Sequence, residues 1–289
     1  MKTLWIAAFS FALVALSGCG SKPAGTGNTA PKDGAAPAGS DTLAKIKKEG
    51  VLKWGADPSG GAPFVFTDPN DPDKVIGFEL EIMEKLSKHL GLKHEIVRGQ
   101  WDTLPANLLA GRSDMVMNGL EINEERKKKV SFSEPYFVYE QQLTVRAEDK
   151  DKYKSLEDLK GKNVGTLSGA EANNVLKAAG FAEENIKPYD DSFTPYRDLE
   201  AGRVDAVLQE DLIAAHYVKA DKMPKLFNQP KTFAPGKYAV AVRPADKTLL
   251  DEVNKALDIM KKNGEIAEIY KKWNIWNERQ KEVGIQEKK

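Results

Sequence analysis

The 289-residue chain is poor in cysteine, in net charge and in histidine. Cys19 is its only cysteine, so no intramolecular disulfide bond can form. Lysine plus arginine and aspartate plus glutamate both number 43, which leaves no basic excess to neutralise a nucleic-acid backbone. His89, His94 and His216 are scattered, and the chain has no nucleophile elbow or phosphate-binding loop. We therefore expect no metal, no cofactor and no nucleic-acid partner.

The N-terminal residues 1–18 have the parts of a secretory signal peptide. Lys2 precedes an apolar run over residues 4–16, which is too short to span a bilayer comfortably. Residues 16–19 read Leu-Ser-Gly-Cys and resemble the lipobox of bacterial lipoproteins, whose cysteine is diacylglycerylated and becomes the new N-terminus. We expect Cys19 to carry a lipid anchor that holds the protein extracytoplasmically in the cell envelope, in the periplasm or on the outer cell surface. An incidental cysteine is the alternative.

The two ends of the chain are expected to lie outside the folded part. Beyond Cys19, residues 20–40 contain no large apolar side chain and are rich in glycine, alanine and proline. Such a composition cannot bury enough surface to offset its ordering entropy, so residues 19–40 are predicted to be a lipidated cysteine and a disordered tether. Folding is expected to start near Asp41. Residues 277–289 are predicted to be a charged C-terminal tail.

Helical and strand patterns alternate from residue 41 to about residue 276, which predicts an α/β fold with largely parallel sheets. Residues 51–56 and 163–167 have the pattern of strands. Residues 80–90 have one apolar helical face and stop at Gly91. Residues 155–158 resemble a capping box, and Pro195 suits the first turn of a helix.

One sequence pattern occurs twice. Residues 110–117 read Ala-Gly-Arg-Ser-Asp-Met-Val-Met, and residues 201–208 read Ala-Gly-Arg-Val-Asp-Ala-Val-Leu. Each copy predicts a helix that ends at a glycine and is followed by a short buried strand, so we expect two lobes of similar build; chance similarity is the alternative. Ligands of open α/β sheets bind beyond the carboxyl ends of strands, which directs attention to residues 118–121 and 209–211.

Three motifs then occur in a characteristic order. Residues 77–82 read Gly-Phe-Glu-Leu-Glu-Ile, residues 124–126 read Glu-Glu-Arg with Phe-Ser-Glu-Pro-Tyr at 132–136, and residues 269–273 read Ile-Tyr-Lys-Lys-Trp. Together they resemble the polar amino-acid solute-binding proteins of ABC importers, known as solute-binding protein family 3. Ser87 departs from the first motif, where a small apolar residue is expected.

The resemblance implies an α/β, two-lobed, periplasmic-binding-protein-like (type II) fold, in which each lobe is a central, mostly parallel sheet flanked by helices. Lobe 1 is then expected over residues 41–143 plus 238–276, with lobe 2 inserted over residues 144–237. The two crossings are expected near residues 141–145 and 233–236, and Gly236 suits a hinge.

The same resemblance implies the site. Arg126 aligns with the family's carboxylate-binding arginine, whose planar fork matches a carboxylate. Glu210 falls where the family has its ammonium-binding aspartate, with Asp211 as the alternative. Trp101 is expected either as a pocket wall or as a core residue. We predict that the ligand site consists of Asp57, Trp101, Asn118, Gly119, Glu121, Arg126, Gly169, Ala170, Glu171 and Glu210.

Some residues depart from the family's pattern. The loop over residues 58–64 is one residue longer than usual and lacks the aromatic residue that commonly lies over the ligand. Glu121 replaces an expected serine or threonine and is expected to offer its backbone amide. Ser168 to Glu171 replace a glycine followed by hydroxyl residues, which leaves amides at a helix start but no hydroxyls.

The functional expectation is a monomeric solute-binding component of an ABC importer that closes its lobes over a polar amino acid and delivers it to the permease. If Asp57, Glu121, Glu171 and Glu210 all face the cleft, four carboxylates oppose Arg126, which predicts a cationic ligand such as arginine, lysine or ornithine. If Glu121 and Glu171 point into solvent, glutamine fits equally well. The alternatives are a dehydratase-like enzyme on the same fold, with Glu171 or Glu121 as general acid, and a ligand sensor.

Overall fold

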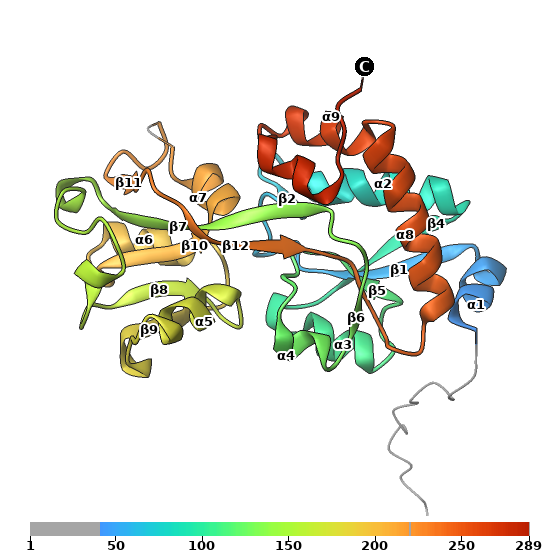
Figure 1. Cartoon of the computed structure of the whole chain (residues 1–289), viewed down its shortest axis with the longest axis horizontal. Coiled ribbons are helices and arrows are strands. Elements are labelled where there is room, and N and C mark those ends of the chain that lie inside the picture. Colours follow the sequence, from blue (N-terminus) through green and yellow to red (C-terminus); the bar gives the residue numbers. More distant parts are fainter. Residues whose placement is uncertain (1–40, 220, 289) are drawn as a thin grey trace, which may run out of the picture. The chain divides into compact units, whose positions relative to one another are not determined.

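The computed structural model describes residues 41–219 and 221–288 (Figure 1). The predicted signal peptide, Cys19 and the predicted tether lie outside the described residues. The described part has an α/β fold with two main sheets, each of them flanked by helices. The elements of the first lobe are α1 (Thr42–Glu49), β1 (Val51–Ala56), β2 (Phe66–Asp68), β3 (Asp71–Ile76), α2 (Phe78–Leu90), β4 (Lys93–Arg98), η1 (Trp101–Thr103), α3 (Leu104–Leu109), β5 (Met115–Val116), α4 (Glu124–Lys127), β6 (Ser131–Phe132), β13 (Ala241–Val242), α8 (Lys247–Lys262) and α9 (Glu265–Lys272).

The second lobe contains the middle of the chain. Its elements are β7 (Phe137–Arg146), η2 (Ala147–Asp149), η3 (Glu157–Leu159), β8 (Val164–Leu167), α5 (Glu171–Ala178), η4 (Glu183–Asn185), β9 (Ile186–Tyr189), α6 (Thr194–Glu200), β10 (Ala206–Glu210), α7 (Asp211–Tyr217), β11 (Leu226–Asn228) and β12 (Phe233–Tyr238).

Both main sheets are mixed. The first has the order β4-β1-β5-β13-β6, in which β4, β1 and β5 are parallel and β13 runs antiparallel to β5 and β6. The second has the order β11-β7-β10-β8-β9, in which β10, β8 and β9 are parallel and β7 is antiparallel to β10 and β11. The antiparallel strands differ from the mostly parallel expectation because β7 and β13 follow chain crossings and not strand–helix units.

Several local predictions are confirmed. Strand β1 has the predicted bounds, and α2 ends where Gly91 adopts a left-handed φ of 69°. Pro195 lies in the first turn of α6. The capping-box residues 155–158 lead into the 3-10 helix η3, which includes Glu157 and Asp158, and into no α-helix. The Asp158 carboxylate accepts hydrogen bonds from the amides of Lys154 and Ser155.

The repeated pattern is a repeated structure. Gly111 and Gly202 both have a φ of 75°, and each follows a helix and precedes a strand. The aspartate of each copy then joins its strand to a neighbouring segment. Asp114 donates its amide to the carbonyl of Lys53 and accepts the Lys53 amide on its carboxylate, and Asp205 does the same with Asn163. The expectation of similar local construction in the two lobes is therefore confirmed at these junctions.

Two strands connect the lobes. The long strand β7 pairs with β12 through its first half and with β10 and β11 through its second half. A bulge interrupts the β7–β12 pairing between Phe233 and Gly236. A Cβ atom on Gly236 would lie 2.2 Å from the ring of Tyr139, so close packing requires glycine at this position.

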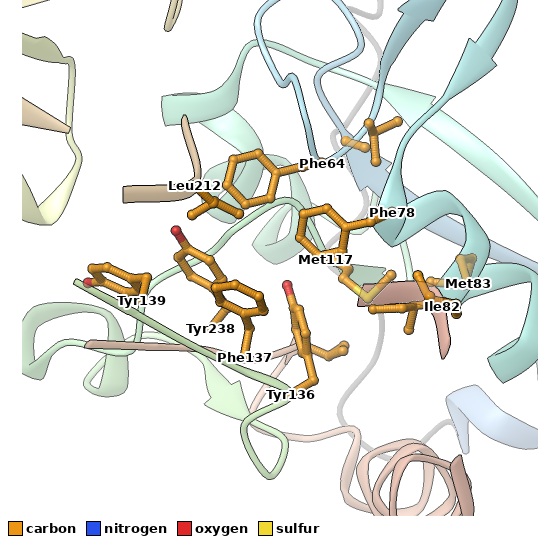
Figure 2. Packing of buried hydrophobic residues seen from close by; sticks show 14 of the residues in the cluster. Phe64, Phe78, Ile82, Met83, Met117, Tyr136, Phe137, Tyr139, Leu212 and Tyr238 are labelled. Atoms are coloured by element: carbon orange, nitrogen blue, oxygen red, sulfur yellow. The ribbon is translucent and has the colours of Figure 1, made fainter. Parts of the chain in front are cut away.

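An aromatic group at the start of β7 and the end of β12 joins these strands to the first lobe (Figure 2). The Tyr238 ring is stacked between those of Phe137 and Tyr139, with centroid distances of 5.5 and 4.6 Å. Phe78 of α2 packs against Phe137 at 5.9 Å. The strand pair that crosses between the lobes is therefore anchored in a large buried core.

The C-terminal segment, predicted as a charged tail, packs against this core. Residues 278–283 form the 3-10 helix η5 (Glu278–Val283), and Val283 and Ile285 belong to the buried cluster. The buried side chain of Gln280 accepts from the amide and donates to the carbonyl of Val138 in β7. Within the described residues, no helix combines the length and apolar character that a bilayer crossing requires.

Candidate functional site

Arg126 lies at the centre of the predicted site. It belongs to the short helix α4, which begins where the side chain of Asn123 accepts the Arg126 amide at 2.8 Å. The guanidinium lies over the ring of Trp101, with 5.0 Å between Cζ and the ring centroid. Its Nη1 donates to the carbonyl of Glu121 at 2.9 Å and to the Glu121 carboxylate at 2.6 Å, and its Nη2 donates to the carbonyl of Gly169 at 3.0 Å. The arginine therefore contacts both lobes.

Glu121 is fully buried and joins the two lobes. Its backbone pairs with that of Tyr238, at the end of the returning strand β12. One carboxylate oxygen binds Arg126, and the other accepts the amide of Glu171, the first residue of α5, at 2.9 Å. The sequence left open whether the side chain of Glu121 points inward or only its backbone amide is used, and in the structure the side chain is buried and makes these contacts.

Trp101 and Asn118 are joined by a hydrogen bond. The indole Nε1 of Trp101 donates to the carbonyl of Asn118 at 2.7 Å. The side chain of Asn118, which follows β5, accepts the amide of Asp57 at 2.6 Å, and its Nδ2 makes no hydrogen bond. Trp101 is buried and also packs with Leu104 and Leu108, so it is at once part of a core and the support of the Arg126 guanidinium.

Asp57 lies at the end of β1, and its carboxylate is used locally. It accepts the amide of Ser59 at 2.9 Å and that of Trp101 at 3.1 Å. These bonds hold the start of η1, and with it the indole, at the edge of the sheet. The Asp57 carboxylate therefore orients Trp101 in this structure.

Gly119 is bound by a buried carboxyl group. The side chain of Glu79, in α2, accepts the Gly119 amide at 2.8 Å and the hydroxyl of Tyr136 at 2.5 Å. Gly119 has a φ of 59°, and a Cβ there would lie 2.7 Å from the ring of Phe64, so glycine is required on both counts. Burial raises the pKa of Glu79 to about 7, against the lowering effect of its two hydrogen bonds.

The second lobe contributes Glu210 at the end of β10. Glu210 is 3% exposed. Its pKa is raised well above the ordinary value, first by burial and then by the charge of Glu121 and a hydrogen bond with it. The charges of Glu121, Glu210 and Glu171 also raise the pKa of Tyr139, after burial as the largest cause. These acidic residues therefore gather at the crossing strands.

The start of α5 faces the first lobe through backbone and side chain. Gly169 offers its carbonyl to Arg126, and Ala170 is buried beside Trp101. The carboxylate of Glu171 accepts the side-chain amides of Asn123 at 3.1 Å and Asn174 at 3.0 Å. Asp211, the alternative to Glu210, forms an ion pair with Arg279 in the C-terminal segment.

Two cavities adjoin Trp101. One of about 460 Å³ is lined by Arg126, Gly169 and Ala170. The other, beside Gly119 and Glu210, has a volume of about 10 Å³, too small for an amino acid, so a ligand that reaches Glu210 requires the lobes to separate. Sequence analysis did not predict several of its lining residues: Gly60, Gly61, Phe64, Leu167, Ser192 and Ile213. Leu167 ends β8, so the rule of strand carboxyl ends could have found it. Ser192 belongs to no recognisable motif. No group of three or more His, Cys, Asp or Glu residues in the described ranges could hold a metal ion.

The family comparison covers almost all of the described chain. Residues 52–275 match the model of the bacterial extracellular solute-binding proteins, family 3. The chain belongs to this family. It is 35% identical to the L-cystine-binding protein TcyJ of Escherichia coli (strain K12), over 80% of this chain and 85% of that protein. It is 30% identical to the L-cystine-binding protein TcyA of Bacillus subtilis (strain 168), over 94% of this chain and 97% of that protein.

Solved structures agree with this membership. An ancestral arginine-binding protein bound to glutamine has a TM-score of 0.71 and 38% identity, over 78% of this family 3 chain and 99% of that one. The ancestral amino acid-binding protein AncCDT-1, a precursor of cyclohexadienyl dehydratase, has a TM-score of 0.73 and 33% identity, over 80% of this chain and 99% of that one. The predicted two-lobed, solute-binding-protein-like fold is thereby confirmed.

Proposed function

We propose that the protein is the extracytoplasmic solute-binding component of an ABC importer, which captures a polar amino acid by lobe closure and delivers it to the permease. Membership of the family over residues 52–275 supports this function. Its relatives are named as binding proteins for cystine, histidine, arginine and glutamine, which are all amino acids with polar side chains. We propose that it acts as a monomer.

The observation that carries the proposal is that a guanidinium in α4 and a buried carboxyl group at the end of β10 lie on either side of the same cavity wall, Trp101. An amino acid is a zwitterion, and in a dry cleft its carboxylate requires a cation and its ammonium an anion. Arg126, supported by Trp101, supplies the cation from the first lobe. Glu210, at the end of β10, supplies the anion from the second lobe once an ammonium replaces its proton.

An enzymatic function is the weaker proposal. A dehydratase needs a carboxylic acid that donates a proton to its substrate. Glu121 accepts from Arg126 and the Glu171 amide, and Glu171 accepts from two asparagine side chains, so the two expected general acids both act here as acceptors. We therefore propose binding without turnover.

Thermal-shift screening of the full-length Cys19→Ala protein against amino acids tests the function. A ligand that binds only the folded state stabilises it by about 2.7 kcal/mol at 100 times its Kd, so the melting temperature should rise. Competition calorimetry with arginine, lysine, glutamine and glutamate then tests the cationic preference that we propose for the ligand. A tighter complex with glutamate than with either basic amino acid contradicts that preference, and no response to any amino acid contradicts the function.

We also propose that Cys19 carries a lipid anchor. Its context in residues 16–19 supports this proposal. The Cys19→Ala protein should lose incorporation of labelled fatty acid and keep the ligand affinity of the parent. Retained labelling, or a loss of affinity, contradicts the proposal.

A further inference from the structure

The carboxylate of Glu121 occupies the donors that an amino-acid carboxylate needs. Its two oxygens accept from the Arg126 guanidinium at 2.6 Å and from the first amide of α5, at Glu171, at 2.9 Å. A guanidinium and the positive end of a helix are both favourable partners for a carboxylate. Glu121 is fully buried, so its side chain fills this position and leaves solvent outside.

The same carboxylate holds the lobes together. Glu121, in the first lobe, pairs with Tyr238 at the end of the crossing strand β12, and its side chain reaches α5 in the second lobe. Arg126 and Asn123, also in the first lobe, reach Gly169 and Glu171 in the second. Nη1 of Arg126 and the Glu171 amide already have the Glu121 carboxylate as their acceptor, so a ligand carboxylate that takes these donors has to displace it.

We propose that Glu121 is an internal competitor: its carboxylate takes the place of the ligand's carboxylate in the ligand-free protein, fastens the two lobes, and must be displaced when an amino acid binds. The ligand part of this inference rests on the proposed function. The fastening of the lobes does not, because it concerns the protein alone.

Displacement has a consequence for ligand choice. Once a ligand carboxylate takes Arg126, the Glu121 carboxylate loses its only ion-pair partner among the described residues and stays beside Glu210. An unpaired buried charge is unfavourable, and a second cation on the ligand compensates it. A neutral amino acid offers no such cation. Glu121 should therefore weaken the binding of neutral amino acids more than that of cationic ones.

The test uses the full-length Cys19→Ala protein with Glu121→Ser, which removes the carboxylate, and arginine and glutamine as probes. Displacement of a charged hydrogen bond is no longer required, so glutamine should bind at least about tenfold more tightly than to the parent. The affinity ratio of arginine to glutamine should fall. Glu124→Gln, three residues further on at the exposed start of α4, is the matched control and should change neither affinity.

Unchanged or weaker glutamine binding to the Glu121→Ser protein overturns the proposal, because Glu121 is then a ligand contact or a structural group and no competitor. If Glu121→Ser fails to fold by circular dichroism, Glu121→Gln replaces it, since it removes the charge and keeps the size. Glutamine should then bind several-fold more tightly, and equal or weaker binding overturns the proposal in the same way.

A measurement without ligand separates this inference from the proposed function. Small-angle X-ray scattering of the ligand-free proteins should give a larger radius of gyration for Glu121→Ser than for the parent and for Glu124→Gln. Equal radii overturn the fastening role. If the parent binds no amino acid, the proposed function fails, while the scattering comparison still decides whether Glu121 fastens the lobes.

Discussion

Buried carboxyl groups have distinct tasks in this protein, and their hydrogen-bond partners decide which. Glu79 accepts hydrogen bonds from the amide of Gly119 and the hydroxyl of Tyr136, so it fixes the loop at Gly119 without being a predicted ligand contact itself. Asp57 binds the amide of Trp101 and fixes the indole under Arg126. Glu121 takes the guanidinium itself. A carboxylate that accepts backbone amides positions the residues of the site. A carboxylate that pairs with Arg126 competes with the ligand for the guanidinium.

The Glu79 carboxyl group should make stability depend on pH. Its pKa is raised from 4.5 to about 7 in the folded protein. The unfolded chain binds fewer protons than the folded one between these values. The contribution of Glu79 to the free energy of unfolding is therefore fully present below about pH 4.5 and is lost as the pH rises through about 7. The shift corresponds to about 3 kcal/mol. Glu210 and Asp211, whose pKa values are also raised, add a loss common to both proteins, so urea denaturation at pH 5 to 8 should show a steeper loss in the parent than in Glu79→Gln.

The exposed Glu84, in the same helix, provides the control for that experiment. Glu84→Gln should keep the pH dependence of the parent. If Glu79→Gln and the parent lose stability in parallel between pH 5 and 7, Glu79 does not titrate in this range and the prediction is wrong.

Arg126 should be required for binding. Loss of its guanidinium leaves a ligand carboxylate without a charged partner, and truncating such a buried pair costs about 2–5 kcal/mol. Arg126→Lys should also weaken binding, because an ammonium cannot reproduce the planar fork or its position over Trp101. Calorimetry and circular dichroism check both variants. A folded Arg126→Ala protein whose affinity lies within twofold of the parent contradicts the assigned role.

At the scale of elements, the C-terminal segment braces the strands that connect the lobes. Arg279 of η5 forms ion pairs with Glu140 in β7 and with Asp211 at the start of α7. Gln280 bonds to both backbone groups of Val138 in the same strand. Burial raises the pKa of Asp211, and the nearby Arg279 opposes that shift. The segment lies beyond residues 52–275, where the family model matches.

Removal of the Arg279 guanidinium should therefore destabilise the fold. Arg279→Gln leaves Glu140 and Asp211 without their cation, and hydrogen bonds to charged groups contribute about 1.5–3 kcal/mol, so we expect a loss in this range. Lys281→Gln, in the same 3-10 helix, breaks only exposed pairs with Glu278 and Glu287 and should destabilise the fold much less, as is typical of surface pairs. Equal free energies of unfolding for the two variants would show that the ion pairs of Arg279 do not stabilise the fold.

At the scale of the whole molecule, binding is a change between closed and open arrangements of the lobes. The cavity of about 10 Å³ beside Glu210 has no room for an amino acid, so a ligand that contacts Glu210 has to meet a form in which the lobes are apart. The apparent affinity then depends on how much of the ligand-free protein is open. Glu121, Arg126 and Asn123 set this population because they join the lobes.

Stopped-flow kinetics should reveal the opening step. If the ligand-free protein is mainly closed, the observed association rate should level off at high arginine concentration, where opening becomes limiting. Glu121→Ser should raise that plateau, since one of the contacts between the lobes is gone. A rate that rises linearly with arginine concentration in the parent, up to the highest concentration measured, contradicts the prediction.

The amino-acid sequence by itself determined the α/β class, the bounds of β1, the end of α2 at Gly91 and the repeated junction at Gly111 and Gly202. These features depend on side-chain periodicity and on backbone freedom within a few residues, so they can be read locally. The prediction that Arg126 binds a ligand carboxylate also came from the sequence, through the family resemblance that the order of short motifs carries.

Only the tertiary structure decided how the carboxylates are used. Glu121 meets the amide of Glu171 across 50 residues, Asp57 meets that of Trp101 across 44, and Gln280 meets Val138 across 142. Such partners come together through the packing of sheets and crossing strands. No local sequence pattern encodes which acceptor pairs with a given donor in the folded protein. The sequence therefore indicated a site rich in carboxylates, whereas packing decided that Glu121 holds the arginine.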